Sequence, residues 1–406
     1  MKIISKQKGF ALLLLIAALA GSTAFVTVTA LNNLSSNTRI ARDKITAAAL
    51  AQARDALLGY AITYAESHPG NVQGYLPCPD KSGTALGGEG AAEGHCSAKN
   101  ISAIGRLPWK TLDIPVLRGG DNECLWYAVS GTYKYNPKTD LMDWDTSGQL
   151  QVYAYDGTTL LTSANNQAVA VILAPGTTAP GQDRSGNAAP ICTGNYTASN
   201  YLDAAGKINN ANVSNTAGAN SQFRIGDPTL NTSDHLVYIT KQDIWNAIKK
   251  RNDFGIFVAS LLNAAKTCLS STSLPPVVIN FNNSPLTEVS GGTPTGYLTI
   301  GRVPHSCLTS PLDNWQDNLL YAACSSGTAC LSINSASCHG VVIFSGEQNT
   351  SQVRITNTDK NTWSNYLEDM PSANNLTAFT TGGTAFTGAS SYSTTATSSD
   401  ILACIP

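Results

Sequence analysis

The alternation of apolar and polar residues sets the first thirty positions apart from the rest of the chain. Residues 1–9 include three lysines and no acidic residue, whereas residues 10–30 carry no charge at all. A helix of that length spans about 30 Å, which is the thickness of the hydrocarbon layer of a membrane. The pattern predicts a transmembrane helix over 10–30, with the lysines in the cytoplasm and the remaining chain outside. A cleavable secretory signal that ends at Ala30 is the alternative.

The helical pattern continues beyond the apolar span. Apolar residues recur at steps of three, four and seven positions between Leu34 and Tyr60, and most charged residues fall on the other faces. Neither proline nor glycine interrupts residues 22–58. We therefore expect one helix from residue 10 to about residue 66, whose first half is embedded in lipid and whose second half packs on a folded domain.

The rest of the chain contains two copies of one pattern. The motif IGRLP at 104–108 returns as IGRVP at 300–304, and in each case Asp-Asn follows fifteen residues after the arginine. Four further pairs of short matches occur in the same order: 125–128 with 319–322, 168–176 with 341–346, 200–203 with 365–368, and 233–234 with 399–400. Matches that keep their order and spacing indicate an internal duplication.

Each copy is preceded by a predicted amphipathic helix, at 41–66 and at 241–269. Runs with the composition of β-strands lie at 151–155, 169–173, 235–240, 297–300 and 340–344. The expected fold class is α+β, with a long N-terminal helix followed by two tandem units that each place a helix on an antiparallel sheet. The predicted divisions of the chain are 1–9, 10–30, 31–240 and 241–406.

The ten cysteines indicate the compartment. Their number is even, no two of them form a CxxC motif, and they follow an export segment. We therefore expect disulfides in an oxidising compartment, which would stabilise both units. Two local pairs are predicted, Cys78 with Cys96 and Cys330 with Cys338, and the pairing of the other six is left open.

Composition and motifs exclude several classes of function. Charged residues make up 13% of the chain, about half the usual share, and the net charge is −2. No basic surface for a nucleic acid is therefore expected. The sequence contains no nucleophile elbow, phosphate-binding loop, zincin helix or dinucleotide fingerprint. We expect a protein that is not an enzyme.

Two sets of residues are nevertheless candidates for a site. Asp143, Asp145 and Ser147 place oxygen atoms at alternate positions before a glycine, as calcium loops do, although the closing glutamate of an EF-hand is missing. An ordinary Asp-Gly turn is the alternative, and no other cofactor is expected. Arg106 and Arg302 of the repeated motif are predicted to pair with the aspartate fifteen residues on. A twofold ligand site is the alternative for these arginines.

The segment Lys8-Gly9-Phe10, followed directly by the apolar span, resembles the leader junction of type IV pilins and of the pseudopilins of type II secretion systems. The resemblance implies that a prepilin peptidase cuts between Gly9 and Phe10 and that Phe10 becomes methylated. Pilins usually carry glutamate at the fifth position after the cut, where this chain has Leu14. In the family that glutamate pairs with the amino terminus of a neighbouring subunit, and tip pseudopilins lack it. Leu14 therefore favours a tip subunit.

The resemblance predicts a non-enzymatic minor pilin or pseudopilin at the tip of a type IV pilus or a type II secretion pseudopilus. Such a subunit acts in filament initiation and in contact with a surface or a substrate. Its expected partners are other pilins or pseudopilins, the prepilin peptidase and the inner membrane, with no nucleic acid. The head would lie in the periplasm before assembly, and at the cell surface or pseudopilus tip afterwards. The alternative is a membrane-anchored, disulfide-rich extracytoplasmic binding protein that never enters a filament.

Overall fold

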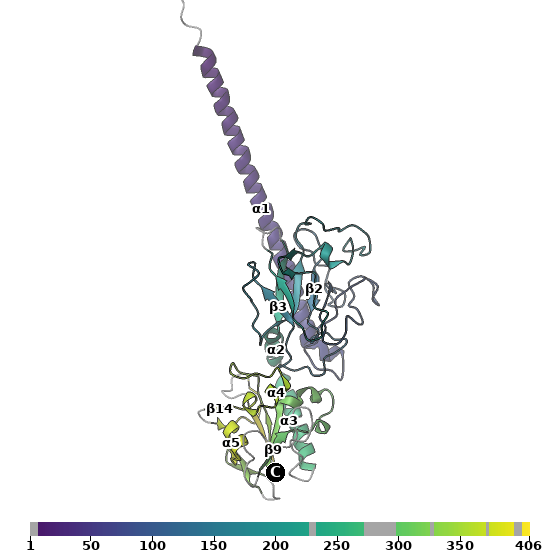
Figure 1. Cartoon of the computed structure of the whole chain (residues 1–406), viewed down its shortest axis with the longest axis vertical. Helices are drawn as coiled ribbons and strands as arrows, with labels where there is room; N and C mark the ends of the chain where they lie inside the picture. The colour runs from purple at the N-terminus through teal and green to yellow at the C-terminus, as the bar shows by residue number, and fades with distance from the viewer. Residues whose placement is uncertain (1–6, 227–232, 272–297, 325–328, 371–372, 394–399) are drawn as a thin grey trace, which may run out of the picture.

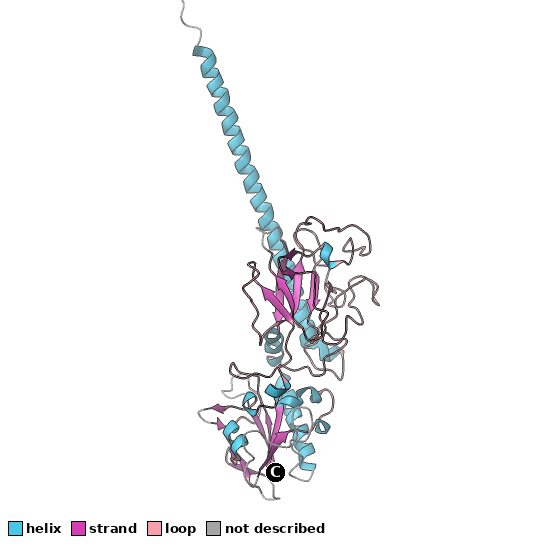
Figure 2. Cartoon of the chain, viewed as in Figure 1, coloured by secondary structure: helices cyan, strands magenta, loops and turns pink. Residues whose placement is uncertain are grey.

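The computed structural model describes residues 7–226, 233–271, 298–324, 329–370, 373–393 and 400–406. For residues 7–36 it describes the helical backbone and not the side chains. The chain forms a long helix, α1 (Gln7–Ser67), followed by two units that lie one after the other along the longest axis (Figure 1). Strands form the centre of each unit, and helices and long loops surround them (Figure 2).

The second half of α1 packs on the sheet of the first unit. This half is rich in alanine, the residue with the highest helix propensity, and it buries Leu50, Ala53 and Leu57 at helical spacing. The helix ends at Ser67 because Pro69 lacks an amide hydrogen for the next turn and Gly70 takes up a φ of 84°. The first half of α1 extends away from both units (Figure 1).

The expected fold class is wrong in its description of the N-terminal helix. No helix in the described part of the chain has both the length and the apolar character needed to cross a membrane. The described side chains of α1 begin at residue 37 and soon include Arg39, Arg42, Asp43 and Lys44. These residues lie beyond the predicted span at 10–30, for which the structure describes the backbone alone. The chain is a mixed α and β protein with disulfides, and a membrane-spanning half of the helix is not found.

The first unit is built on a sheet of six strands. These are β1 (Ala103–Arg106), β2 (Trp126–Val129), β3 (Leu150–Tyr153), β4 (Ala168–Ala174), β7 (Ser221–Arg224) and β8 (His235–Thr240). The order is β1-β2-β4-β3-β7, and β8 also pairs with β4. All seven residues of β4 are buried, in keeping with its uninterrupted apolar sequence. A short helix and a small hairpin lie in the loops: η1 (Ala198–Asn200), β5 (Ala204–Ala205) and β6 (Ile208–Asn209).

The second unit is built on a four-stranded antiparallel sheet in the order β17-β13-β10-β9. Its strands are β9 (Leu298–Arg302), β10 (Leu319–Cys324), β13 (Gly340–Phe344) and β17 (Ile401–Ile405). Smaller strands flank it: β11 (Leu331–Ile333), β12 (Ala336–Cys338), β14 (Asp369–Met370), β15 (Ala373–Asn374) and β16 (Ala385–Phe386). The short helices are η3 (His305–Cys307), η4 (Leu312–Asn318), α4 (Asn357–Lys360), η5 (Trp363–Asn365) and α5 (Asn375–Thr381).

The expectation of purely antiparallel sheets is also wrong. Strand β7 runs parallel to β3 in the first unit, and β16 runs parallel to β11 in the second. Parallel pairing requires a long crossover, and each of these pairs is separated by a loop-rich connection of about fifty residues or more. The loop-rich segments therefore contain strands, β7 and β16, that the alternation of apolar and polar residues does not predict.

The register of the sheets confirms the internal duplication. Strands β1, β2, β4 and β8 of the first unit have the same order and direction as β9, β10, β13 and β17 of the second. Gly105 lies opposite Tyr127 in the first unit, and Gly301 lies opposite Tyr321 in the second. The two tyrosines then lie opposite equivalent residues of β4 and β13. The repeated sequence motifs occupy equivalent places in the two sheets.

The predicted helix at 241–269 is in fact two helices, α2 (Lys241–Lys249) and α3 (Phe254–Ser271). Helix α2 contacts α1 and β8 of the first unit, whereas α3 packs on β13 and β17 of the second. The break is held by Arg251, whose guanidinium lies 2.6 Å from Glu66 and 2.8 Å from Asp253. The prediction of helical structure at 241–269 is confirmed, but the prediction of one continuous helix is wrong.

Aromatic side chains from both units form one continuous core at their junction. The ring of Trp315 in the second unit lies 4.9 Å from Trp144 and 5.5 Å from Trp245, both of the first unit, in edge-to-face geometry. Phe344 of β13 adds a contact to Trp144 at 5.3 Å. All of these rings belong to a single buried cluster. Aromatic pairs of this kind add about 0.5–1.5 kcal/mol each to the burial of their area, so the junction is firmly packed.

Five disulfides staple the described chain: Cys78–Cys96, Cys124–Cys192, Cys268–Cys307, Cys324–Cys330 and Cys338–Cys404. The predicted pair Cys78–Cys96 is confirmed, and the predicted pair Cys330–Cys338 is wrong. Cys338 lies opposite Leu331 in the β11–β12 hairpin. Because neighbouring residues of a strand point to opposite faces, Cys330 is directed away from Cys338. The disulfides indicate an oxidising, extracytoplasmic environment.

Candidate functional site

The junction between the two units contains a buried ion pair. The guanidinium of Arg354 in the second unit donates a hydrogen bond of 3.0 Å from Nη1 to Oδ2 of Asp145 in the first. The side chains are 0% and 1% exposed. The amide of Asn318 donates a second hydrogen bond to the same carboxylate oxygen, at 3.1 Å. The two units are therefore joined by charge as well as by aromatic packing.

Arg354 has an equivalent in the first unit, which is Arg184. Each guanidinium donates to the backbone carbonyl eight residues earlier, at 2.9 Å for Arg354 and 3.0 Å for Arg184. Each also donates to the glutamine two residues earlier, at 3.1 Å and 2.9 Å respectively. Each lies over a tyrosine ring, Tyr366 in the second unit and Tyr201 in the first. The two arginines thus belong to one duplicated network.

The two networks differ in the origin of the carboxylate. Arg184 pairs with Glu123 of its own unit at 3.2 Å, whereas Arg354 pairs with Asp145 of the other unit. In the first copy, Glu123 and Cys124 stand between the repeated Asp-Asn motif and the leucine that follows it. In the second copy these two positions are missing, and Leu319 follows Asn318 directly. The second copy therefore lacks the glutamate, and the first unit supplies the missing carboxylate.

Two neighbouring carboxyl groups, those of Asp143 and Asp317, lie beside this ion pair. Burial, followed by the charges of Asp317 and Asp145, raises the pKa of Asp143 well above its usual value. Burial opposes ionisation of Asp317 too, but the neighbouring Lys360 and Arg302 outweigh it and lower the pKa of that carboxyl. The two carboxyl groups interact with each other, and these shifts favour a neutral Asp143 beside an ionised Asp317. Lys360 completes the network at 2.9 Å from Asp317.

The residues predicted for calcium all lie here. Asp143, Asp145 and Ser147 line one cavity of about 590 Å³ between the units. Oδ1 of Asp143 accepts hydrogen bonds from the backbone amides of Asp145 and Thr146 at 2.8 and 3.1 Å, which is the geometry of an Asx turn. Arg354 neutralises Asp145. Within the described residues, no three His, Cys, Asp or Glu side chains are grouped to hold a metal ion.

The predicted partner of Arg106 pairs elsewhere, because Asp121 forms an ion pair with Arg42 at 2.8 Å. The charge of Arg302 does act on Asp317 and lowers the pKa of its carboxyl group. Arg106 donates to the carbonyls of Thr193 and Asn195 at 2.9 and 2.8 Å, and Arg302 donates to the carbonyls of Asp317 and Lys360. Each guanidinium also lies over aromatic rings of its own unit. The two arginines therefore anchor long loops to the sheets in an equivalent way, as structural residues of the duplication.

The predicted processing residues lie where no side chain is described. Gly9, Phe10 and Leu14 belong to the backbone of α1, and the structure gives no side-chain contact for them. Cleavage after Gly9, methylation of Phe10 and the role of Leu14 stay predictions. No family model, curated protein or solved structure matches this chain.

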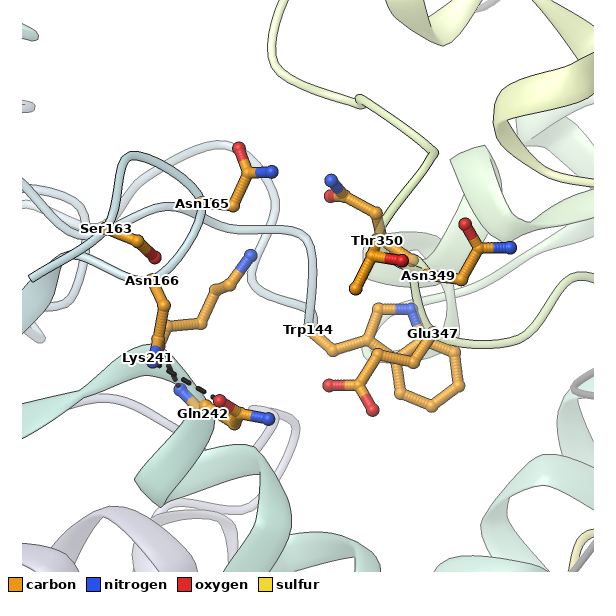
Figure 3. Close-up of a pocket in the computed structure, with 10 residues that line it drawn as sticks. Trp144, Ser163, Asn165, Asn166, Lys241, Gln242, Glu347, Asn349 and Thr350 are labelled. Atoms are coloured by element: carbon orange, nitrogen blue, oxygen red, sulfur yellow. Dashed lines mark hydrogen bonds between the residues drawn. The ribbon is translucent and has the colours of Figure 1, made fainter.

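A second cavity, of about 280 Å³, lies on the other side of Trp144 and is drawn in Figure 3. The first unit contributes the loop at 163–166 and the beginning of α2, and the second unit contributes the loop after β13. Its lining is rich in carboxamides and hydroxyls: Trp144, Ser163, Asn165, Asn166, Lys241, Gln242, Glu347, Gln348, Asn349 and Thr350. A cavity of this composition can bind a small polar molecule by hydrogen bonds.

The sequence contains one further repeated motif, which points to an arginine of the junction. GQDR at 181–184 returns as SQVR at 351–354, at the same offset of 170 residues as the preceding glycines at 176 and 346. That repeat identifies Arg184 and Arg354 as equivalent residues. It does not identify Asp145 as a partner, because Asp145 is 209 residues away from Arg354.

Proposed function

We propose that the protein is a non-enzymatic minor subunit of the pilin or pseudopilin type, placed at the end of an extracytoplasmic filament. Lys8-Gly9-Phe10 supports the processing step, and Leu14 in place of the usual glutamate supports the terminal position. The head acts in filament initiation and in contact with a surface or a substrate. Its partners are the other subunits of the filament and the peptidase that removes the leader.

The path of α1 is the observation that carries this proposal. The helix has 61 residues, about 90 Å in length, and only its second half packs on the first unit. Where it leaves the head, Ile40 and Ile45 are 65% and 54% exposed. Large apolar side chains that are exposed along a projecting helix are suited to a bundle with helices of other subunits.

The arrangement of the two units supports a terminal rather than a repeating position. The second unit lies at the end of the head that is opposite to the free half of α1 (Figure 1). A subunit with this shape extends well beyond its helix bundle. The second unit would therefore be presented to the exterior at the end of a filament, with the first unit facing the subunits below.

The processing step is tested by mass spectrometry of the amino-terminal peptide. We expect N-methylated Phe10 in the wild type and a retained leader in Gly9→Val, because a bulky side chain at the junction blocks the peptidase. Gly21→Val is the matched control, since it makes the same substitution inside the apolar span and leaves the junction intact. A mature terminus at Leu31, or an intact terminus at Met1 in the wild type, would contradict the proposal.

The terminal position is tested by immunogold labelling of sheared fibres with antibodies against the head. We expect gold particles at fibre ends only. Leu14→Glu supplies the usual counter-charge for a neighbouring amino terminus, so that some of this variant should appear along the shaft. Regular labelling along wild-type shafts would overturn the terminal position.

A binding protein outside any filament is the second candidate, and the polar cavity drawn in Figure 3 favours it. The same fibre experiment separates the two functions. Fibres without any label, together with normal export of the head, would support the binding protein.

A further inference from the structure

The cavity of Figure 3 contains a lysine whose ammonium group has no partner among the residues that the structure describes. Lys241 is the first residue of α2, and in Figure 3 its ammonium group points into the space between Asn165 and Thr350. In the described part of the chain it forms no ion pair and no side-chain hydrogen bond. Burial lowers its pKa, while the charges of Asp145, Asp143 and Glu347 act in the opposite direction from beyond ion-pair distance.

The nearest acidic residue of the cavity is already paired. Glu347 lines the wall opposite Lys241 and forms an ion pair with Lys249 of α2. On the other side of Trp144, Asp145 is neutralised by Arg354. Within the described residues, the ammonium group of Lys241 therefore has no carboxylate at ion-pair distance in this cavity. An anionic group of a ligand can take that place.

The amino end of α2 does not itself provide this anion site. The amide of Gln242 donates to Oδ1 of Asn166 at 3.0 Å, and the amide of Asp243 donates to Oγ1 of Thr240 at 3.2 Å. The amide of Lys241 donates to a backbone carbonyl at 3.3 Å. Backbone amides at a helix amino end often bind phosphate, but here they already donate hydrogen bonds within the protein. The guanidinium of Arg354, which could also bind a phosphate group, is paired with Asp145. A single carboxylate on the Lys241 ammonium fits this arrangement better than a phosphate group does.

The rest of the lining is suited to hydroxyl groups. Asn165 and Thr350 are exposed at the mouth of the cavity, from opposite units, and their side chains form no hydrogen bond within the described chain. Carboxamides and hydroxyls both donate and accept, as the hydroxyl groups of a sugar require. The indole N–H of Trp144 is buried and also lacks a partner among the described residues. The lining offers no apolar pocket for a peptide side chain, since Trp144 is only 2% exposed.

We propose that this cavity binds one residue of an acidic polysaccharide, a sugar that carries a carboxylate. The carboxylate lies against Lys241, and the sugar hydroxyls bind the amide of Asn165 and the hydroxyl of Thr350. The volume of about 280 Å³ is slightly below the roughly 300–1,000 Å³ of sites for drug-sized ligands, so the cavity has room for one sugar residue. Because both units line the cavity, binding requires the intact junction. The inference does not depend on filament assembly.

The test uses the full-length protein, purified in mild detergent, in calorimetric titrations with trigalacturonate. A charge-assisted hydrogen bond contributes about 1.5–3 kcal/mol, so we expect Lys241→Met to weaken binding by about ten- to a hundredfold. Lys241→Arg keeps the charge and should bind within a few-fold of the wild type. Lys250→Met is the matched control, because it removes an exposed lysine at the other end of the same helix, away from the cavity, and should bind as the wild type does. The melting temperature of each variant checks its folding.

Two further titrations identify the ligand chemistry. Galactotriose has the same hydroxyl pattern without the carboxylate and should bind at least about tenfold more weakly than trigalacturonate. Monomeric galacturonate should bind with nearly the affinity of the trimer, since the cavity has room for one residue. Equal binding of trigalacturonate to the wild type and a folded Lys241→Met variant, or equal binding of the neutral sugar, would overturn the proposal. Absence of binding to the wild type would overturn it without affecting the fibre experiment.

Discussion

Replacing Asp145 by alanine removes the carboxylate that neutralises Arg354 across the junction. Because the two side chains are 1% and 0% exposed, bulk water would solvate the remaining guanidinium of Arg354 poorly. Removing one partner of a buried ion pair costs about 3–5 kcal/mol, since the remaining charge stays in a medium of low dielectric constant. We expect Asp145→Ala to lower the free energy of unfolding by an amount in this range, with the second unit affected most.

The ion pair between Arg42 and Asp121 provides a matched control. Its atoms are 2.8 Å apart, closer than those of the junction pair, but its side chains are 47% and 24% exposed. Exposed pairs contribute about 0–1 kcal/mol because water solvates the partner that remains. Arg42→Ala should therefore change the free energy of unfolding by less than about 1 kcal/mol. The comparison separates the effect of burial from that of distance.

Urea unfolding of the full-length protein, followed by tryptophan fluorescence, measures both variants. Trp144 is adjacent to Asp145 and packs on Trp315 of the second unit, so the signal reports on the junction. Equal transition midpoints for Asp145→Ala and Arg42→Ala would refute the reasoning. The double variant Asp145→Leu with Arg354→Met is a second test. It removes both charges of the pair together and should recover most of the lost stability.

Three further predictions concern stability and covalent structure. Burial raises the pKa of Asp234 and of its counterpart Asp400 from 3.8 to about 7. Between these pH values the carboxyl groups have lost their protons in the unfolded chain and keep them in the folded chain. The free energy of unfolding therefore falls by about 1.4 kcal/mol for each pH unit and each of the two groups as the pH rises from 4 to 7. Asp400→Asn should make this fall less steep in urea titrations. In Gly105→Ala the added methyl group would lie 2.5 Å from a backbone carbonyl oxygen, and we expect a lower melting temperature. Non-reducing peptide mapping should join Cys338 to Cys404.

The duplicated part of the fold could be predicted from the sequence because its motifs are local. IGRLP and IGRVP lie on edge strands that pair in the same register, and the buried strands β4 and β13 have uninterrupted apolar sequences. Cys78 and Cys96 are separated by only 18 residues, so proximity along the chain was sufficient to pair them. Local composition and spacing determine these features.

The features that could not be predicted depend on contacts between distant segments. The polar run at 249–253 interrupts the apolar spacing and marks the break between α2 and α3. What the sequence does not reveal is that Arg251 pairs there with Glu66, far earlier in the chain. Asp143 and Asp145 have the spacing of a calcium loop, and the sequence does not reveal that Arg354 of the second unit pairs with Asp145. Calcium binding at this turn stays a prediction. An aspartate-rich turn has the same sequence whether a metal ion or an arginine neutralises it. The tertiary partner decides between the two.

The absence of two residues from the second copy explains why the head contains a junction of this kind. Glu123 pairs with Arg184 inside the first unit, and the adjacent Cys124 forms a disulfide with Cys192, so that network is complete without a neighbour. The second copy has neither residue, and Arg354 takes its buried carboxylate partner from the first unit instead. An uncompensated buried charge is unfavourable by several kcal/mol, which is a large part of the stability of a small domain. We therefore expect the second unit to depend on the first for part of its stability, because the carboxylate that neutralises Arg354 comes from the first unit.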